Sequence, residues 1–414
     1  MNEPWKPTDA IIFHCDCNNF FASCECMERP ELKNVPMAVA GDPEKRMGIV
    51  VAKNELAKKY GVKTTDTVRE AQRKCPNIVF VPPRHRLYKQ VSDRVNAVYC
   101  DYTAYVEPAS IDESYLDMTE TVRSRKCDPK TLADELRARV RVKIGVTISV
   151  GVSFCKVFAK MGSDYKKPDA TTVITRENYR ELLWKLPVSD LIFAGRVTTA
   201  ALQRRGIMTI GDLAAYTQEE MRAMLGKQGD QLWRYANGVD DSKVRLYGDD
   251  PEIKSVSRGR TFPHDLTTEN EVRAGLTRLA DDVARALRRE GKKGSVVDVQ
   301  IRRPDMSTIS RQTSLRHATY LQHEIRDVAF GLVKENWRIG SSQPIRALTV
   351  GVSKLISEED EVEQLSLFDT DGDLRRRQEK LERVMDTIRQ KHGKGAVTLG
   401  FRSDADSDMQ HEPK

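Results

Sequence analysis

The sequence of 414 residues has no apolar run long enough to span a membrane, and its first residues, MNEPWKPTD, lack the basic-then-apolar order of a signal peptide. Its eight cysteines include no C-x-x-C pair, and without a secretory context we expect reduced thiols. No internal repeat or long low-complexity region is present. With 31% charged residues, the chain is expected to be a soluble, cytoplasmic protein of roughly two to four domains.

Two C-x-C pairs, at residues 15 and 17 and at residues 24 and 26, invite a zinc or iron–sulfur interpretation. In a strand, however, Cys15 and Cys17 share one face while Asp16 points to the other. We therefore expect these thiols to act as small apolar residues that pack the strand against helices.

Positive charge is concentrated in one region of the chain. The net charge is +7, from 68 basic and 61 acidic residues. Between Ser255 and Ile356 there are 18 Lys and Arg against 11 Asp and Glu, which is +7, so the rest of the chain sums to zero. An excess confined to one domain is typical of a protein that binds a phosphate backbone, although solvated helix faces contribute to such an excess as well.

Three acidic residues lie where buried strands end. Asp16 belongs to IIFHCDCNNFFASCE (residues 11–25), and Asp112 and Glu113 belong to VEPASIDESYLDM (residues 106–118). In each stretch apolar residues run up to a carboxylate and then turn. Carboxylates gathered at a sheet edge repel one another unless a cation lies between them, which predicts a magnesium site. The alternative role for acids at strand ends is turn formation or helix capping.

The alternation of helices and strands predicts an α+β sheet domain with an insertion, followed by further units. The segments expected, in order, are a strand and turn over residues 10–21, an inserted helical and extended unit over 22–82, the rest of the sheet domain over 83–175, short helices over 176–243, a linker over 244–254, a small antiparallel α+β domain over 255–357, and a charged helix from Asp373 to about His392.

Four long motifs carry a resemblance to a known family. DCNNFFASCE, GIVVAKNELAKKYGVKTTDTVREAQRKCP, ASIDESYLDMT and SVGVSFCKVFAKMGSDYKKP occur in the order and spacing seen in Y-family DNA polymerases. The chain resembles these lesion-bypass enzymes over about residues 10–357. Within the family it is most similar to the bacterial DNA polymerase IV branch.

The resemblance implies an α+β multidomain protein with the right-hand polymerase fold. Its implied parts are the palm (residues 1–21 and 83–175), the fingers (22–82), a thumb with a helix-hairpin-helix (176–243), a linker (244–254), a DNA-binding little finger (255–357) and a C-terminal tail (358–414).

The resemblance also implies a catalytic centre with two Mg²⁺ ions. Asp16, Asp112 and Glu113 match the family's catalytic metal-binding acids, and the main-chain carbonyl of Cys17 would be a further ligand. Asn18 stands where relatives often carry Asp, and because that side chain is not an expected ligand the change should be tolerated. The consecutive residues Asp112 and Glu113 would face opposite ways in a regular strand, so both reach one cluster only if the backbone bends.

Two residues are implied to select the sugar and to contact the triphosphate. Phe20 and Phe21 are both implied to lie at the nucleotide, and Phe21 matches the steric-gate position, where a ring leaves no room for a 2′-hydroxyl. Core packing is the alternative role for this pair. Lys167 matches a lysine that touches the incoming triphosphate, and it shares a helix face with Lys160 seven residues earlier.

The fingers supply the other implied nucleotide contacts. Lys58, where many relatives carry arginine, is a second candidate for binding the triphosphate. Glu55 stands where polymerase IV relatives usually have Tyr, which removes one phosphate contact and adds a negative charge. Val51 and Ala52 would lie over the nascent base pair, and their small size suits an open site tolerant of damaged templates.

DNA contacts are expected from the thumb and the basic domain. In the thumb, DLIFAGRVTTAALQRRGIMTIGDLA resembles a helix-hairpin-helix, whose turn at Gly195 would hold a phosphate. Phe193 replaces the first glycine of the usual Gly-x-Gly, and a plain helical turn is the alternative. In the basic domain, arginines on a sheet face can grip phosphates without reading bases. About half of the following are expected to touch DNA: Arg258, Arg260, Arg302, Arg303, Arg311 and Arg316.

The tail contains a match to the bacterial sliding-clamp peptide Q-L-x-L-F, with 46 residues following it. The leucine and aromatic side chains would fill an apolar groove of the clamp. The matching residues are Gln364, Leu365, Leu367 and Phe368.

The sequence is therefore interpreted as a template-directed, low-fidelity DNA polymerase that performs translesion synthesis by two-metal nucleotidyl transfer. No second acidic cluster suggests a proofreading exonuclease. The expected partners are primer–template DNA, dNTPs and the sliding clamp, with no membrane partner, and the chain is expected to be monomeric.

Two alternatives remain. DCNNFF and AKNELAK favour a polymerase V-type catalytic subunit that needs accessory proteins, whereas the single-chain layout and MGIVV favour polymerase IV. The other alternative is a catalytically silent DNA- and clamp-binding adaptor, against which the intact acids and Lys167 argue.

Overall fold

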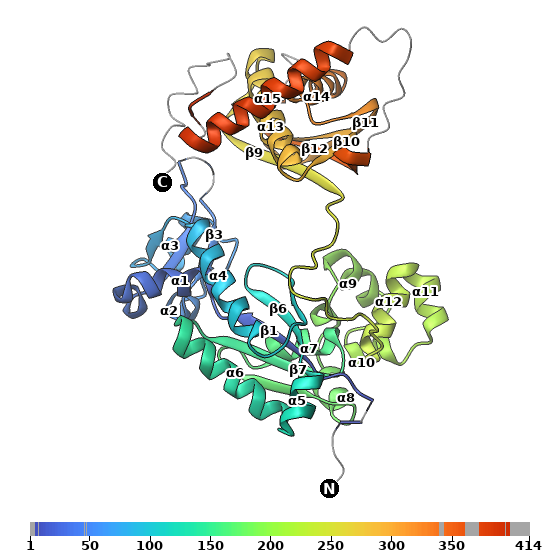
Figure 1. Ribbon diagram of the computed structural model, residues 1–414. Coiled ribbons are helices and arrows are strands. Elements are labelled where there is room, and N and C mark those ends of the chain that lie inside the picture. The colour runs from blue at the N-terminus through green and yellow to red at the C-terminus, as the bar shows by residue number, and fades with distance from the viewer. Residues whose placement is uncertain are drawn as a thin grey trace. The chain divides into compact units, whose positions relative to one another are not determined.

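The computed structural model describes residues 5–6, 8–44, 46, 48–338, 343–360, 372–393 and 395–397. The chain forms two compact units, which divide after Asp250 (Figure 1). Each unit has its own hydrophobic core. No helix in the described part of the chain is long and apolar enough to cross a membrane.

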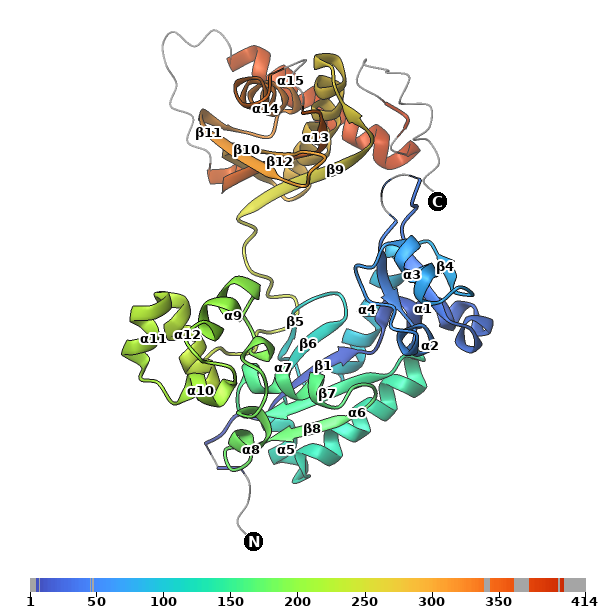
Figure 2. The same cartoon turned by 180° about the vertical axis from the view of Figure 1, so that it is seen from behind.

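A five-stranded sheet forms the centre of the first unit, with strand order β5-β6-β1-β7-β8. The central strand β1 pairs antiparallel with both β6 and β7. Helices α4 and α6 pack on one face of this sheet and α7 packs on the other (Figures 1 and 2). The bounds are β1 Ile12–Cys17, β5 Val106–Pro108, β6 Glu113–Asp117, β7 Ile148–Ser153, β8 Thr171–Ile174, α4 His85–Cys100, α5 Thr119–Arg125, α6 Pro129–Ile144 and α7 Lys156–Tyr165.

The alternation of side chains along β1 decides what reaches each face. Phe13, Cys15 and Cys17 enter the core shared with α4 and α6, and all are buried. His14 and Asp16 point to the opposite face, where His14 bonds Ser163 of α7. The prediction that Cys15 and Cys17 pack the strand against helices, with Asp16 on the other side, is confirmed.

The inserted unit contains a small sheet of order β3-β2-β4 with short helices around it. Asn54 caps α2 by accepting a hydrogen bond from Ala57 N, and Thr67 and Glu70 form a capping box at the start of α3. The bounds are α1 Phe20–Glu28, the 3₁₀ turn η1 Pro30–Asn34, β2 Met37–Ala40, β3 Val50–Lys53, α2 Glu55–Lys59, α3 Val68–Lys74 and β4 Val79–Val81.

Short helices with a core of their own follow the sheet domain. Their bounds are α8 Tyr179–Leu183, the 3₁₀ turn η2 Val188–Asp190, α9 Arg196–Gln203, α10 Ile210–Ala214, α11 Gln218–Leu225 and α12 Lys227–Ala236. The expected linker over residues 244–254 belongs in part to the first unit. Val244 is buried, and the amide of Arg245 donates to Glu107 Oε2 at 3.0 Å.

The second unit is a four-stranded antiparallel sheet of order β11-β10-β12-β9, with α13 and α14 packed on one face. The strands expected over residues 295–303, 308–316 and 345–355 and both helices are present, and β9 is an additional edge strand. The bounds are β9 Ser255–Leu266, α13 Glu269–Arg289, β10 Lys292–Arg302, β11 Thr308–Thr319, α14 Gln322–Asn336, β12 Ile345–Ser357 and the 3₁₀ turn η3 Glu358–Asp360.

A last helix, α15 (Gly372–His392), confirms the charged helix expected near the C-terminus. It docks on the second unit through charged side chains. Arg288 of α13 pairs with Glu382 and with Asp386, the latter at 2.6 Å, and both Arg288 and Glu382 are nearly inaccessible to solvent. Arg389 reaches Asp281 of α13 at 3.0 Å. The helix is thus held by buried ion pairs rather than by an apolar seam.

Candidate active site

Two of the three predicted acids lie side by side on the palm sheet. The register of β1 and β6 pairs Asp16 directly with Glu113, and residues paired across an antiparallel ladder project from the same face. Both carboxylates therefore lie on the face covered by α7. The Asp16 side chain is only 8% exposed and that of Glu113 26% exposed.

Two lysines of the α7 region neutralise this acidic pair. Lys160 Nζ lies 2.5 Å from Glu113 Oε1 and 3.5 Å from Asp16 Oδ2, and Lys167 Nζ lies 2.6 Å from Asp16 Oδ2. Asp164, between them in sequence, contacts both ammonium groups. The prediction that Lys160 and Lys167 share one helix face is wrong, because α7 ends at Tyr165 and Lys167 lies in the loop that follows, although both ammonium groups reach Asp16.

The pKa of Asp16 reflects this environment. Burial raises it, and so does a hydrogen bond that the protonated Asp16 donates to the neighbouring Glu113, while the ammonium groups of Lys167 and Lys160 oppose the rise, so that it lies at about 6. Burial by itself lowers the pKa of Lys160, but its contacts with Glu113, Asp164 and Asp16 raise it overall. The two carboxylates and the two lysines thus form one group of charges at the strand ends, in which each charge shifts the pKa of its neighbours.

Asp112 lies in a backbone bend, as we expected if Asp112 and Glu113 are to face the same side. It lies in the hairpin tip just before β6, and its main-chain carbonyl accepts a hydrogen bond from Cys17 N at 3.0 Å. Its carboxylate turns to Ser110, whose hydroxyl donates to Asp112 Oδ1 at 2.7 Å. Among the described residues no three His, Cys, Asp or Glu side chains converge on one point. The structure brings Asp16 and Glu113 together and leaves the Asp112 side chain outside that pair.

The donor set suits a hard divalent cation. Carboxylate oxygens and a main-chain carbonyl are the ligands that Mg²⁺ takes in proteins. In the structure two ammonium groups of the chain itself lie against the acid pair and balance its negative charge.

A glycine allows α7 to approach the sheet closely enough for these contacts. A Cβ atom at Gly151 of β7 would lie 1.8 Å from the carbonyl oxygen of Ala159. Gly162 of α7 faces the same spot, because a Cβ there would lie 3.0 Å from the Cα of Gly151. The pair of glycines therefore sets the depth at which Lys160 enters the site.

Phe20 and Phe21 have different surroundings although they are adjacent. Phe20 is buried, whereas the Phe21 ring is partly exposed. Phe21 stacks on Tyr88 of α4, with centroids 4.1 Å apart and planes 13° apart, and meets His85 edge-on. Packing alone thus accounts for Phe20, while Phe21 presents a partly exposed ring supported by Tyr88 and His85.

The fingers residues predicted to contact the nucleotide are held near the same place. Val51 and Ala52 of β3 are partly buried and pack, with Phe21, against the same small core. Glu55 at the start of α2 accepts a hydrogen bond from Asn19 Nδ2 at 2.9 Å and lies 3.6 Å from Lys58 Nζ. The added negative charge of Glu55 is therefore paired with the lysine predicted to bind phosphate.

His14 was not predicted to belong to the site, but its ring lies close to the Glu113 carboxylate. Its ring is fully buried, Nδ1 lies 2.8 Å from Ser163 Oγ, and Nε2 lies 3.8 Å from Glu113 Oε2. Burial and the nearby Lys160 and Lys167 lower the pKa of His14 well below its ordinary value. The signal in the sequence is the period of two, which places residue 14 on the same face as residue 16.

In the turn before α9, Phe193 adopts a positive φ, although it stands where the motif usually has glycine. Phe193 has φ of 69°, and its carbonyl accepts a hydrogen bond from Gln228 Nε2 at 3.1 Å. Gly195 is the N-cap of α9, and no atom lies within 4 Å of the place where its Cβ would be. Phe193 thus has a left-handed backbone, a conformation that glycine adopts more easily than phenylalanine.

The predicted arginines of the second unit are divided between the two faces of its sheet. Arg258 pairs with the buried Val350, and Arg311 pairs with the buried Val299, so both lie on the face that carries the helices. Arg260, two residues after Arg258, lies on that face as well. Arg302 lies on the opposite face. Side chains alternate between the two faces along each strand, so the position of each arginine in the ladder decides which face it occupies.

Arg303 and Arg316 complete the predicted set. Arg303 follows β10 in the turn to β11, where its amide donates to Ser307 O at 2.9 Å. Arg316 is exposed on β11. The clamp-peptide residues Gln364, Leu365, Leu367 and Phe368 lie outside the described residues.

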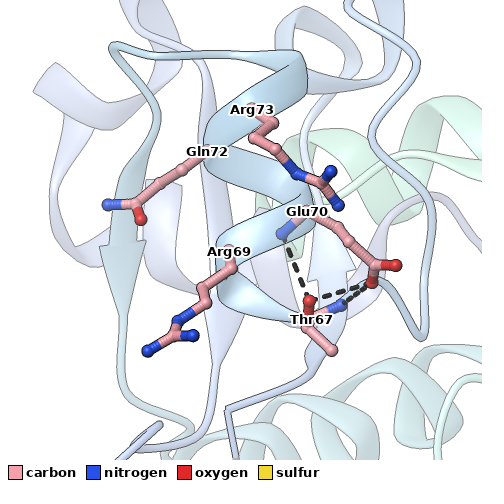
Figure 3. A pocket seen from close by; sticks show the side chains of 5 residues that line it. All are labelled: Thr67, Arg69, Glu70, Gln72 and Arg73. Atoms are coloured by element: carbon pink, nitrogen blue, oxygen red, sulfur yellow. Dashed lines mark hydrogen bonds between the residues drawn. The ribbon is translucent and has the colours of Figure 1, made fainter.

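A surface cavity lies away from these residues. It has a volume of about 580 Å³ and is lined by residues of α3 and its cap (Figure 3). It contains none of the predicted site residues. Its lining residues are Thr67, Arg69, Glu70, Gln72 and Arg73.

Comparison with known proteins gives consistent matches along the chain. Residues 15–164 match the model of the impB/mucB/samB family, and residues 253–367 match the model of that family's C-terminal domain. A protein named DNA polymerase IV from Acetivibrio thermocellus is 42% identical over 94% of this chain and 97% of its own length. DNA polymerase IV 1 of Bacillus subtilis is 35% identical over 94% of this chain and 92% of its own length.

A solved structure shares the fold. A Y-family DNA polymerase chimera superposes with a TM-score of 0.74 at 23% identity, covering 84% of this chain and 99% of the chimera. The α+β, multidomain right-hand architecture expected from the sequence is thereby confirmed.

Proposed function

Because the chain belongs to the impB/mucB/samB family, together with bacterial proteins named DNA polymerase IV, we propose that it is a template-directed DNA polymerase that bypasses lesions with low fidelity. Its substrates are primer–template DNA and dNTPs. The observation that carries this proposal is the pairing of Asp16 with Glu113 at the centre of the palm sheet, flanked by two lysines.

Asp16, Asp112 and Glu113, with the carbonyl of Cys17, are proposed to hold two Mg²⁺ ions. When bound, the ions would activate the primer 3′-hydroxyl and neutralise the departing pyrophosphate. The protein's own part is to keep the carboxylates ionised and in register. Lys160 does this by binding Glu113 and Asp16 at once.

Lys167 is proposed to bind the triphosphate of the incoming nucleotide. Its ammonium group lies against Asp16, and a lysine binds phosphate as a compact charge. Lys58 is proposed to give a second phosphate contact from the fingers. The phosphate would compete with the Glu55 carboxylate for the Lys58 ammonium group.

Phe21 is proposed to exclude ribonucleotides. Its ring is braced by Tyr88 and His85, so it does not yield easily to a 2′-hydroxyl. Val51 and Ala52 are proposed to cover the base pair with small side chains, which leaves room for a damaged base.

The domain boundaries expected from the sequence are proposed for this chain, with residues 244–250 assigned to the first unit. The little-finger arginines and the turn at Gly195 are proposed DNA contacts. Residues Gln364, Leu365, Leu367 and Phe368 are proposed to bind the sliding clamp, and the chain is proposed to act as a monomer.

Primer extension by the purified chain alone, with MgCl₂ and dNTPs, tests the proposal. A polymerase IV-type enzyme extends the primer unaided. Extension only after accessory proteins are added would support the polymerase V-type alternative, and DNA binding without extension under any condition would support the silent adaptor.

A further inference from the structure

Asn18 fills a buried position next to the acid pair and makes three side-chain hydrogen bonds. It follows β1 directly and is 5% exposed. Its Nδ2 donates to Ser149 Oγ at 2.8 Å, and its Oδ1 accepts from Thr147 Oγ1 at 3.1 Å and from Asp169 N at 2.8 Å. The orientation of the amide is fixed, because the main-chain N–H of Asp169 can only donate and so must face the oxygen.

The bond to Asp169 ties the loop after α7 to the end of β1. Asp169 has a left-handed backbone with φ of 50° and lies two residues after Lys167. On its other side, Arg137 of α6 contacts Asp169 Oδ1 at 2.8 Å. The loop is thus held from β1 and from α6.

This closes a short ring of contacts around the site. On one side the chain runs from Asp16 to Asn18, and on the other from Lys167 to Asp169. The two segments are joined at one end by Lys167 Nζ and Asp16 Oδ2, 2.6 Å apart, and at the other by the Asn18 amide. Without the second link, the loop that carries Lys167 would lose its tie to the end of β1 and keep only the contact of Arg137 with Asp169 and the flexible side chain of Lys167 itself.

We propose that Asn18 is a positioning residue, which fixes Lys167 for contact with the triphosphate of the incoming nucleotide. The proposal rests on the polymerase function proposed above. An amide suits this task, because it supplies the acceptor that Asp169 N requires and adds no third negative charge beside Asp16 and Glu113. It also gives the Ser149 hydroxyl a donor.

The test is single-nucleotide insertion by the full chain, with kcat and the dNTP KM measured separately. Asn18→Leu keeps the size of the side chain and removes its hydrogen bonds, and Asn18→Ala is measured beside it. Both are expected to raise the dNTP KM about tenfold, the effect of losing one well-placed charged contact, with the Kd for primer–template DNA unchanged. Asn18→Asp retains the acceptor for Asp169 N and is expected to restore the KM to within about threefold of wild type.

A double-mutant cycle with Lys167→Ala separates positioning from general stability. If Asn18 acts through Lys167, Asn18→Leu changes the KM less than about twofold once Lys167 is absent. Thr147→Val is the matched control, since it removes another bond to Asn18 Oδ1 and leaves the Asp169 link in place.

Three results would overturn the role of Asn18: a wild-type KM in Asn18→Leu and Asn18→Ala, full additivity with Lys167→Ala, or loss of cooperative folding in both variants, which would make Asn18 purely structural. A wild-type chain that adds no nucleotide would instead contradict the proposed function itself. The two failures are therefore distinguishable.

Discussion

Removal of the Glu25 carboxylate is expected to loosen the packing beneath the proposed sugar gate. Glu25 of α1 is fully buried and accepts hydrogen bonds from Arg84 Nη2 at 2.7 Å, Arg29 Nη2 at 2.6 Å and Tyr88 Oη at 2.8 Å. Tyr88 in turn stacks on Phe21. In Glu25→Ala the buried Tyr88 hydroxyl loses its acceptor, while the two arginines, which are partly exposed, can rehydrate.

We expect the free energy of local unfolding to fall by about 3 kcal/mol. The buried Tyr88 hydroxyl left without an acceptor and the loss of the charge-assisted hydrogen bonds to the two arginines both contribute to this cost. Hydrogen exchange of peptides from α1 and α4 measures it, and protection should fall roughly a hundredfold. Glu28→Ala is the matched control, an exposed glutamate on the same helix that should change protection little. Equal protection in Glu25→Ala and Glu28→Ala would refute this account of the Glu25 network.

Three further predictions concern the gate, the tail and a helix cap. Phe21→Ala should raise ribonucleotide incorporation at least about tenfold while changing dNTP use much less; an unchanged preference for dCTP over CTP would make Phe21 ordinary packing. Alanine at Gln364, Leu365, Leu367 and Phe368 should abolish stimulation by the sliding clamp and spare synthesis on short primers, whereas Ser366→Ala, at the unspecified position of the motif, should keep both; clamp binding by the four-alanine variant equal to wild type would rule out the motif. The backbone N–H groups of Thr267 and Thr268 lower the pKa of Glu271 to about 2 against the effect of burial, which raises it. Because the pKa of Glu271 is lower in the folded state, its carboxylate stabilises the protein at pH values above the unfolded-state pKa of about 4.3. This stabilisation is lost as the pH falls towards 2. Because the Glu271 side chain is 31% exposed, Glu271→Gln should cost only about 1 kcal/mol at pH 7 by urea denaturation, with the difference narrowing between pH 5 and pH 3; a difference independent of pH would contradict this.

The local patterns of the sequence determined much of the palm. Alternation along residues 12–17 placed Cys15 in the core and Asp16 on the opposite face, as the structure has them. The bend needed between Asp112 and Glu113 occurs at the hairpin tip. These features follow from the period of two in a strand, which local sequence reveals directly.

Contacts between segments that are distant in the chain could not be predicted from the sequence. Neither the pairing of Lys160 with Glu113 nor the position of His14 behind that carboxylate is visible without the register of β6 and the depth of α7. The sequence also did not show which sheet face each arginine of the second unit occupies; the pairing of Arg311 with Val299 fixes the face of Arg311, and only the ladder shows that. Strand β9 was missed because few of its residues are buried, so it lacks a clear apolar alternation.

The central claim is that Asp112 joins Asp16 and Glu113 in a catalytic metal site. Single-turnover primer extension by Asp112→Ala, measured beside primer–template binding, tests it most directly, with Glu120→Ala as the control because Glu120 is an acid of the same domain with an 89% exposed side chain. Asp112→Ala is expected to lose nucleotide addition and keep DNA affinity, while Glu120→Ala is expected to keep both. Extension by Asp112→Ala above about 5% of the wild-type rate would contradict the metal assignment.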